Sequence, residues 1–367
     1  MYACTMRSSR GQCDRHATLG TGRRPRHVPA PCPVPASPAD GSGSGREPDT
    51  QEALITVADL GEFGLIAAMK ALLPAGTAQL VGIGDDAAVI RAPDARVVAT
   101  MDLLIEGRHF RRDWSAAMDV GRKAAARNLA DIAAMGAIPT ALLVGFATPG
   151  DIPVQWARDL VRGLAREAAR AGASVAGGDV SSADTIMIAV TALGDLAGRD
   201  PVTRGGARPG DKLAVAGRLG RSAAGLALLV AGRTRPAGLV TAHLRPRPPY
   251  DAGPEAAVLG ATSMIDISDG LVQDLGHVAA ASDVRIDIET SLLPDDPSLR
   301  AAAASLGRPG WHAWALAGGE DHALAATFPA GTALPGRWSV IGAVGSGQGI
   351  RVDGQDSPGG SGWDHFR

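Results

Sequence analysis

Seven aspartates, each beside a glycine turn or next to an apolar stretch, constrain this chain most. They are Asp85, Asp86, Asp102, Asp131, Asp179, Asp266 and Asp269. Because apolar residues lead into most of them, we expect these carboxylates at the ends of core elements, where uncompensated anions would each cost several kcal/mol. Hard oxygen ligands favour Mg²⁺, which usually binds through one or two carboxylates together with substrate phosphates. The pattern therefore predicts a site that gathers acids around cations.

Length and composition exclude several classes of protein. A chain of 367 residues is long enough for two domains. A hydrophobic fraction of 45% is typical of a soluble globular protein, and a net charge of −2 gives no basic field for nucleic acid. The last cysteine is Cys32, so no disulfide or Cys nucleophile is expected beyond it. No apolar run approaches the ~18 residues of a membrane span, and no secretory signal is evident. We expect a cytoplasmic protein without membrane or nucleic-acid partners.

We predict three regions: a disordered N-terminal extension (1–55), an N-terminal α/β domain (56–202) and a C-terminal α/β domain (203–367). Residues 1–50 are rich in Arg, Pro, Ser and Gly, a composition that cannot bury enough apolar surface to fold. A transit peptide and a start codon placed too early are the alternatives for this stretch. The segment 203–217, a linker followed by a strand, marks the boundary between the domains.

Hydrophobic spacing and end signals predict the elements of both domains. In the first domain we expect helices at 61–73, 116–135 (ended by Gly136) and 152–172, and strands at 95–102, 140–148, 173–179 and 184–196. In the second we expect helices at 220–232, 254–261 and 268–282, the last capped by Ser268, and strands at 263–267, 284–288, 313–317, 322–328 and 338–344.

Taken singly, the acidic segments of the first domain leave structural alternatives open. The segment GIGDDAA (82–88) could be a simple turn, and Asp102 a turn or capping acid after its strand. Asp131 lies on an apolar helix face, where an ion pair with Arg127 is the alternative. In AGGDVSS the glycines before Asp179 suit close approach of the backbone to phosphate.

The most specific single segment is IDISDGL (265–271). It places Asp266 and Ser268 at a strand end and Asp269 in the first turn of a helix, where an acid could simply complement the helix dipole. GGED (318–321) repeats this theme, with a hairpin turn as the alternative. Arg204 is a candidate partner for phosphate or a solvated linker residue. The stretch GARPGDK lacks the spacing of a P-loop, so this is not a P-loop enzyme.

Taken together and in this order, the segments resemble those of the thiamine-monophosphate kinase family. The resemblance runs from about Ala58 to the C-terminus, and the ordered set is highly specific. Its motifs are GEFGLI, GIGDDAAV, TMDLLIEGRHF, RKAAARNLADIAAMGAIP, AGGDVSS, TRGGARPGD, HLRPRPP, IDISDGLVQDLGH, ALAGGEDH and GWDHF. It implies the two-domain PurM-like α/β (α+β) architecture shared with aminoimidazole ribonucleotide synthetase, and a homodimer.

The resemblance also implies an activity: Mg²⁺-assisted transfer of the ATP γ-phosphoryl group onto thiamine monophosphate, giving thiamine diphosphate in the last step of its biosynthesis. No general base or covalent nucleophile is expected, because the acceptor is itself a phosphate oxygen. The implied metal ligands are Asp86, Thr100, Met101, Asp102, Asp131, Asp179, Asp266 and Asp269. The implied ATP contacts are Gly178, Asp179, Arg204 and Ser268, and the implied substrate contacts are His109, Glu320 and Trp363.

The chain departs from the family pattern at two places. Met101 stands where the family usually has Thr, so only its backbone carbonyl could bind metal. His322 and Ala323 replace the usual Tyr-Glu after GGED and alter the predicted edge of the substrate pocket. Two alternatives stay open: another ATP-dependent enzyme of the same superfamily, or a nucleotide-binding protein without catalysis.

Overall fold

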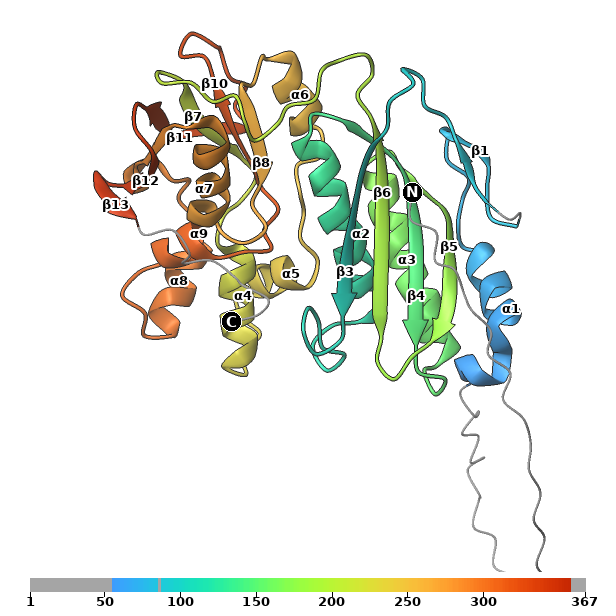
Figure 1. Cartoon of the computed structure of the whole chain (residues 1–367). Coiled ribbons are helices and arrows are strands. Elements are labelled where there is room, and N and C mark those ends of the chain that lie inside the picture. The colour runs from blue at the N-terminus through green and yellow to red at the C-terminus, as the bar shows by residue number, and fades with distance from the viewer. Residues whose placement is uncertain (1–54, 85–86, 358–367) are drawn as a thin grey trace, which may run out of the picture. The chain divides into compact units, whose positions relative to one another are not determined.

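The structure is a computed structural model that describes residues 55–84 and 87–357. Residues 53–367 belong to one compact unit, whose described part is shown in Figure 1. The predicted extension over residues 1–55 falls, except for its last residue, outside the described part, as do Asp85, Asp86 and Trp363. Within the described part, no helix has the length and apolar character of a membrane span.

The first half of the unit is a four-stranded sheet with two helices on one face (Figure 1). The strand order is β3 (Val98–Ile105), β6 (Met187–Asp195), β4 (Ile138–Thr148) and β5 (Ser174–Ser182), with β4 and β5 parallel and the other pairs antiparallel. The covering helices are α2 (Ala117–Ala134) and α3 (Val154–Arg170). Helix α1 (Val57–Lys70) and the paired strands β1 (Gln79–Val81) and β2 (Val89–Ile90) precede β3 in the chain.

Two glycines let α2 and α3 pack closely. A β-carbon on Gly121 would lie 2.0 Å from the carbonyl oxygen of Leu160, and one on Gly163 would lie 2.2 Å from that of Met118. Helix backbone in a close-packed interior cannot yield as a flexible side chain can. Any larger residue at either position would therefore force the helices apart.

The second half is built on a seven-stranded sheet. Its order is β13 (Gln355–Ser357), β12 (Gly349–Val352), β9 (Arg285–Ile288), β11 (Trp338–Gly345), β7 (Lys212–Ala216), β10 (Leu324–Phe328) and β8 (Ser263–Asp266). Strands β9 and β12 pair in parallel, and the other neighbouring pairs are antiparallel. The helices are α4 (Arg221–Val230), α5 (Ala237–Leu244), α6 (Ala252–Val258), α7 (Leu271–Ser282), α8 (Pro297–Ser305) and α9 (His312–Ala317), with a 3₁₀ turn, η1 (Thr290–Leu292).

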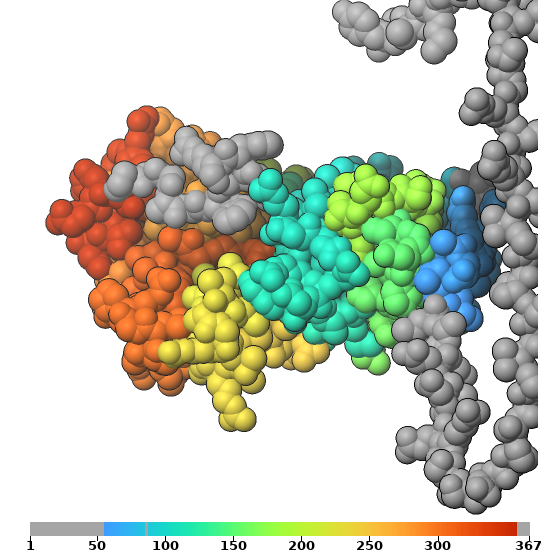
Figure 2. All heavy atoms as spheres, turned by 90° about the horizontal axis from the view of Figure 1, so that it is seen from below, coloured from blue at the N-terminus to red at the C-terminus, as the bar shows by residue number. Residues whose placement is uncertain are grey.

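The two halves share one hydrophobic cluster. Helix α2 contacts the four-stranded sheet as well as β8 and α6, so Leu129 and Ile132 are fully buried. Phe328 and Trp338 of the other sheet join the same cluster, with their rings edge to face. In Figure 2 the atoms of the α4–α5 region (yellow) lie against those around the start of α2 (blue-green). The predicted boundary at residue 203, between β6 and β7, stays a prediction.

The structure confirms the predicted α/β class and most predicted elements, with three corrections. The strand predicted at 313–317 is wrong, because these residues form helix α9. The predicted N-cap Ser268 is wrong as well, since α7 begins at Leu271. The strands predicted to end at Asp102 and at Asp179 continue to Ile105 and to Ser182. Helices α5 and α8 lie in stretches for which the pattern predicts no element.

Candidate active site

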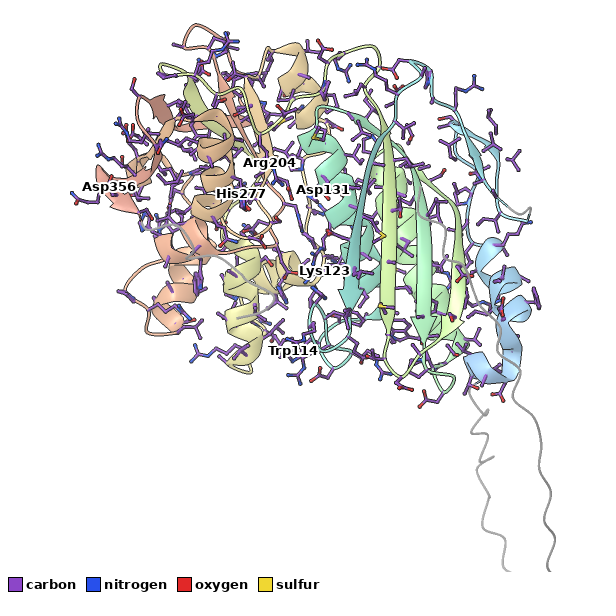
Figure 3. All side chains as sticks on the ribbon, viewed as in Figure 1. Trp114, Lys123, Asp131, Arg204, His277 and Asp356 are labelled. Carbon is purple, nitrogen blue, oxygen red and sulfur yellow. The ribbon has the colours of Figure 1, made fainter. Side chains whose placement is uncertain are left out.

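A cavity of about 740 Å³ lies between the two halves. Its walls come from β3 and the following loop 106–115, from α2, α4 and α5, and from the turns after β8 and α9. Figure 3 shows Lys123 and Asp131 on the side of α2 that faces the second half, with Arg204 nearby. The cavity is of the size that small-molecule pockets usually have, ~300–1,000 Å³.

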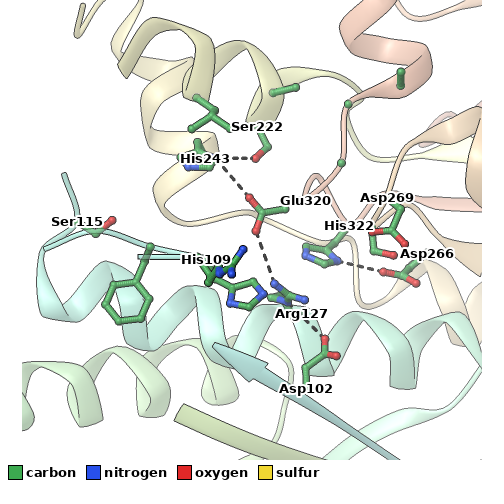
Figure 4. A pocket seen from close by; sticks show the side chains of 18 of the residues that line it. Asp102, His109, Ser115, Arg127, Ser222, His243, Asp266, Asp269, Glu320 and His322 are labelled. Atoms are coloured by element: carbon green, nitrogen blue, oxygen red, sulfur yellow. Dashed lines mark hydrogen bonds and ion pairs between the residues drawn. The ribbon is translucent and has the colours of Figure 1, made fainter. Parts of the chain in front are cut away.

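Four carboxylates from both halves line this cavity: Asp102 on β3, Asp131 on α2, Asp266 at the end of β8, and Asp269 in the turn that follows. Figure 4 shows Asp266 and Asp269 near His322, and Asp102 beside Arg127. Burial, and then the charges of Asp266 and Asp102, raise the pKa of Asp131 to about 7. Neighbours that oppose the ionisation of an acid in this way create a place where a cation is stabilised.

Strand β3 turns Thr100 and Asp102 toward α2, because alternate residues of a strand share a face. Thr100 Oγ1 donates to Asp131 Oδ2 at 2.8 Å, and Asn128 Oδ1 accepts the backbone N–H of Asp102 at 2.8 Å. Met101 lies on the opposite face and is 59% exposed. The contact predicted for its backbone carbonyl stays a prediction.

The acidic groups fit Mg²⁺ by their chemistry. All are hard oxygen ligands, and a divalent cation would relieve the repulsion that raises the pKa of Asp131. Among residues 55–84 and 87–357, no group of three or more His, Cys, Asp and Glu side chains is arranged to hold an ion. A Mg²⁺ site of the phosphate-binding kind does not require such a group, because one or two carboxylates share the ion with phosphates and water.

A set of basic side chains surrounds Glu320, in the turn after α9. The Glu320 carboxylate lies 3.0 Å from Lys123 Nζ, 3.6 Å from Arg127 Nη1 and 3.5 Å from His243 Nδ1. Burial alone would raise the pKa of Glu320, but Lys123, His243 and Arg127 lower it to about 2. Arg127 also reaches Asp102, at 3.4 Å, so it bridges Glu320 and the acidic wall rather than pairing with Asp131.

The imidazole of His243 is neutral at neutral pH. Burial, followed by the nearby charge of Lys123, lowers its pKa to about 4. Ser222 Oγ lies 3.1 Å from His243 Nδ1, in a buried contact between α4 and α5. Ser222 and His243 therefore complete a polar wall around Glu320 without adding a charge.

One buried carboxylate shapes the turn after β8. Asp274 accepts the backbone N–H groups of Ser268, Asp269 and Gly270, each at 3.0 Å. The turn is thus held by a side chain of α7, and Ser268 and Asp269 are left facing the cavity. This contact also explains why Ser268 does not cap α7.

His322, at one of the departures from the family pattern, lies against Asp266. Its Nδ1 is 3.0 Å from Asp266 Oδ2, and in the described part of the chain its buried Nε2 has no hydrogen-bond partner. Glu320 and His322 both adopt the left-handed backbone region, with φ of 65° and 52°. This conformation is uncommon for residues with a β-carbon and is found where the surroundings fix a functional turn.

The remaining predicted site residues divide into three groups. His109 and Arg204 line the cavity, and His109 Nδ1 accepts the backbone N–H of Ile105 at 3.0 Å. Gly178 and Asp179 lie on β5, at the opposite edge of the four-stranded sheet from β3, and do not line this cavity. Asp86 and Trp363 lie outside the described residues. The roles predicted for these six residues stay predictions.

Comparison with known proteins decides the family. Residues 84–196 match the model of the AIR synthase related protein N-terminal domain, and residues 208–354 match that of its C-terminal domain. The thiamine-monophosphate kinase of Mycobacterium tuberculosis is 48% identical over 313 residues, which cover 85% of this chain and 93% of the relative. That of Corynebacterium glutamicum is 44% identical over 290 residues, 76% of this chain and 85% of the relative. The chain belongs to the thiamine-monophosphate kinase family.

Solved structures agree with this assignment. The thiamine-monophosphate kinase from Stenotrophomonas maltophilia is 33% identical, with a TM-score of 0.70, over 80% of this chain and 95% of that chain. The structure of AaThiL complexed with AMPPCP and TMP is 34% identical, with a TM-score of 0.70, over 86% of this chain and 100% of that chain. The predicted two-domain architecture is confirmed, and the protein is an enzyme of the kinase class.

In this member of the thiamine-monophosphate kinase family, several groups around the cavity were not predicted from the motifs. They are Lys123, Arg127, Ser222, His243 and Asp274. Lys123 carried a signal, because it is one of three lysines in the chain and lies on a helix rich in alanine. His243 and Asp274 fall within the motifs HLRPRPP and IDISDGLVQDLGH, but neither motif by itself indicates a role for them.

Proposed function

We propose that this protein transfers the γ-phosphoryl group of ATP to the phosphate of thiamine monophosphate, giving ADP and thiamine diphosphate, as the last step of thiamine diphosphate biosynthesis. The carrying observation is that Asp102, Asp131, Asp266 and Asp269 line one cavity in a chain 48% identical to a thiamine-monophosphate kinase. The related structure with AMPPCP and TMP supports the same pair of substrates here.

The chain's own residues would position two anions that repel each other, ATP and thiamine monophosphate. Mg²⁺, when bound, neutralises and orients the phosphates. The four cavity carboxylates would hold the ions, with Thr100 fixing Asp131 through its hydrogen bond. The pKa of Glu320, lowered to about 2, leaves its carboxylate charged at neutral pH, which supports a contact with the cationic thiazolium ring. The remaining assignments are Asp86, Met101 and Asp179 for metal, Gly178, Asp179, Arg204 and Ser268 for ATP, and His109 and Trp363 for the substrate.

The transfer is in-line and direct. An oxygen of thiamine monophosphate attacks the γ-phosphorus as the bond to the ADP oxygen breaks, and no phosphoenzyme forms. The acceptor phosphate has a second pKa of about 6, so it is mostly ionised at neutral pH and needs no general base. With a chiral γ-phosphate the configuration at phosphorus should invert, and retention would contradict a single transfer.

The deciding experiment incubates the purified full-length protein with ATP, Mg²⁺ and thiamine monophosphate and follows thiamine diphosphate by chromatography. We expect product that depends on all three additions. A folded protein that binds ATP but forms no thiamine diphosphate would instead support the alternative of a nucleotide-binding protein without catalysis.

The sheet face away from α2 and α3 supports a homodimer. Met101, Leu103 and Met187 share this face through the pairing of β3 with β6, and they are 59%, 39% and 37% exposed. Apolar side chains grouped on an open sheet face favour burial against a second copy of the chain. Light scattering should give twice the mass of one chain, and Met187→Glu should shift the protein toward the monomer. A monomeric wild type would contradict the dimer.

A further inference from the structure

A second cavity, of about 330 Å³, lies on the other side of the wall that carries Ser222, His243 and Glu320. Several residues that line it are next in the chain to residues that line the main cavity. Arg221, Ala242 and Asp321 line the second cavity, and each is the direct neighbour of a residue lining the first. We call the second cavity the basic cavity, because its lining includes Arg218, Arg221, Arg245 and Arg247.

The four arginines differ in their partners. Arg221 pairs with Asp296 at 2.6 Å, and Arg245 pairs with Asp119 at 3.2 Å. Within the described part of the chain, Arg218 and Arg247 have no carboxylate within ion-pair distance. Two guanidinium groups therefore border this small cavity without a balancing charge, an arrangement that an anion would stabilise.

One carboxylate lines the basic cavity but does not balance the charges of these two arginines. Asp321 accepts the backbone N–H groups of Gly220 and Ser222, at 2.5 and 2.8 Å. Its oxygens are thus directed at the start of α4, which they cap. The start of α4 is occupied by this contact, so binding of an anion would depend on the arginine side chains.

We propose that the basic cavity is a second anion-binding site, separate from the substrate cavity, that takes the diphosphate group of a small molecule. The guanidinium group forms paired hydrogen bonds with phosphate oxygens, which suits Arg218 and Arg247 to this ligand. The volume of about 330 Å³ is at the lower end of ligand pockets, so it suits a diphosphate and part of its organic group.

The test is calorimetric titration of the full-length protein with inorganic pyrophosphate in EDTA. Without divalent ions, the four carboxylates of the main cavity disfavour an anion there. We expect one pyrophosphate per chain in the wild type. Arg218→Gln/Arg247→Gln should weaken binding by about a hundredfold, roughly tenfold for each guanidinium group removed from the phosphate oxygens. Arg204→Gln, the same change in the main cavity, should leave the affinity unchanged.

Two further measurements make the test more specific. Arg218→Lys/Arg247→Lys should keep an intermediate affinity, because lysine retains the charge but not the paired geometry. Thiamine diphosphate and ADP should each displace pyrophosphate, and the tighter of the two identifies the source of the diphosphate. Absence of binding in the wild type, an unchanged affinity in the double glutamine variant, or loss in Arg204→Gln would overturn the proposal. No turnover is measured, so the outcome is independent of the proposed kinase activity.

Discussion

Lys123 Nζ lies 3.0 Å from Glu320 Oε2, although the two residues are 197 positions apart. Lys123 is 2% exposed and also donates to the carbonyl oxygen of His109, at 3.0 Å. Burial lowers the pKa of Lys123, and the charge of Glu320 opposes this shift. A single buried cation on α2 therefore joins the turn that carries Glu320 to the loop that carries His109.

Replacing this cation should destabilise the fold. We expect Lys123→Met to lower the free energy of unfolding by about 3 kcal/mol, because it leaves the charge of Glu320 without its nearest partner. Urea unfolding followed by tryptophan fluorescence measures the loss. Lys123→Met/Glu320→Gln should recover part of it. A loss below about 1 kcal/mol would mean that the pair contributes no more than one on the surface.

Much of the fold is predictable from local pattern, and the exceptions have local causes. Helices α2 and α3 are long and periodic, so their existence and type follow from the sequence. Helix α9 has only 6 residues, and a short apolar run of that length does not distinguish helix from strand. Ser268 has the side chain of an N-cap, but Asp274, six residues further along, accepts the backbone N–H groups of Ser268, Asp269 and Gly270, so these residues form a turn before α7 begins.

The site is predictable on its acidic side and not on its cationic side. Asp102 and Asp266 each come after apolar residues of their strands, so the pattern itself predicts acids beside the core, although Asp102 lies within β3 and only Asp266 ends its strand. Lys123 and His243 meet Glu320 only because α2 and α5 pack beside the turn after α9. A contact between residues 197 positions apart produces no short-range pattern that a single sequence can reveal.

Asp131→Asn should abolish activity while stabilising the metal-free protein. Loss of one of the carboxylates proposed to hold Mg²⁺ should lower turnover by at least about a hundredfold. In EDTA the thermal midpoint should rise, because the repulsion from Asp266 and Asp102 is removed. Mg²⁺ should stabilise the wild type, by mass action, and the variant less. Asp159→Asn, which removes a half-buried acid of α3 outside the cavity, is the control. Wild-type turnover in Asp131→Asn would remove Asp131 from the metal site.

Stability in EDTA should fall as the pH rises from about 4 to about 7. Burial is the main cause that raises the pKa of Asp131, Asp274 and Asp321 to about 7, from an ordinary 3.8. In this window the folded state keeps protons that the unfolded chain has released, so a rising pH favours unfolding. Glu320, with its pKa of about 2, acts oppositely, and its contribution is lost as the pH falls from 4.5 toward 2.

Urea midpoints at constant ionic strength, measured from pH 4 to 8, test this dependence. The slope of the urea midpoint against pH should be smaller in Asp131→Asn, because one of the three contributing acids is gone. Saturating Mg²⁺ should also reduce it, since bound metal favours the ionised carboxylate. Stability that increases steadily through the window in EDTA would contradict the assigned pKa shifts.

Trp363→Ala should chiefly raise KM for thiamine monophosphate, through loss of stacking on the thiamine rings. Initial rates over a range of substrate concentrations separate KM from kcat. Trp338 lies in the core, so Trp338→Ala would not be a suitable control. Trp114→Ala, at the cavity rim, is compared instead. An unchanged KM in Trp363→Ala would place this residue outside the substrate pocket.

Asp274→Ala should damage the turn after β8 and with it the use of ATP. Three backbone N–H groups would lose their acceptor. Two of these groups belong to Ser268 and Asp269, which are partly exposed, so water can take the place of the lost acceptor there. We expect a loss of about 2 kcal/mol in unfolding free energy and a raised KM for ATP, because Ser268 and Asp269 are no longer held toward the cavity. Asp274→Asn keeps one acceptor oxygen and should fall between alanine and wild type in both measurements. If Asp274→Ala lost stability but kept its KM for ATP, Asp274 would support the fold without positioning the site.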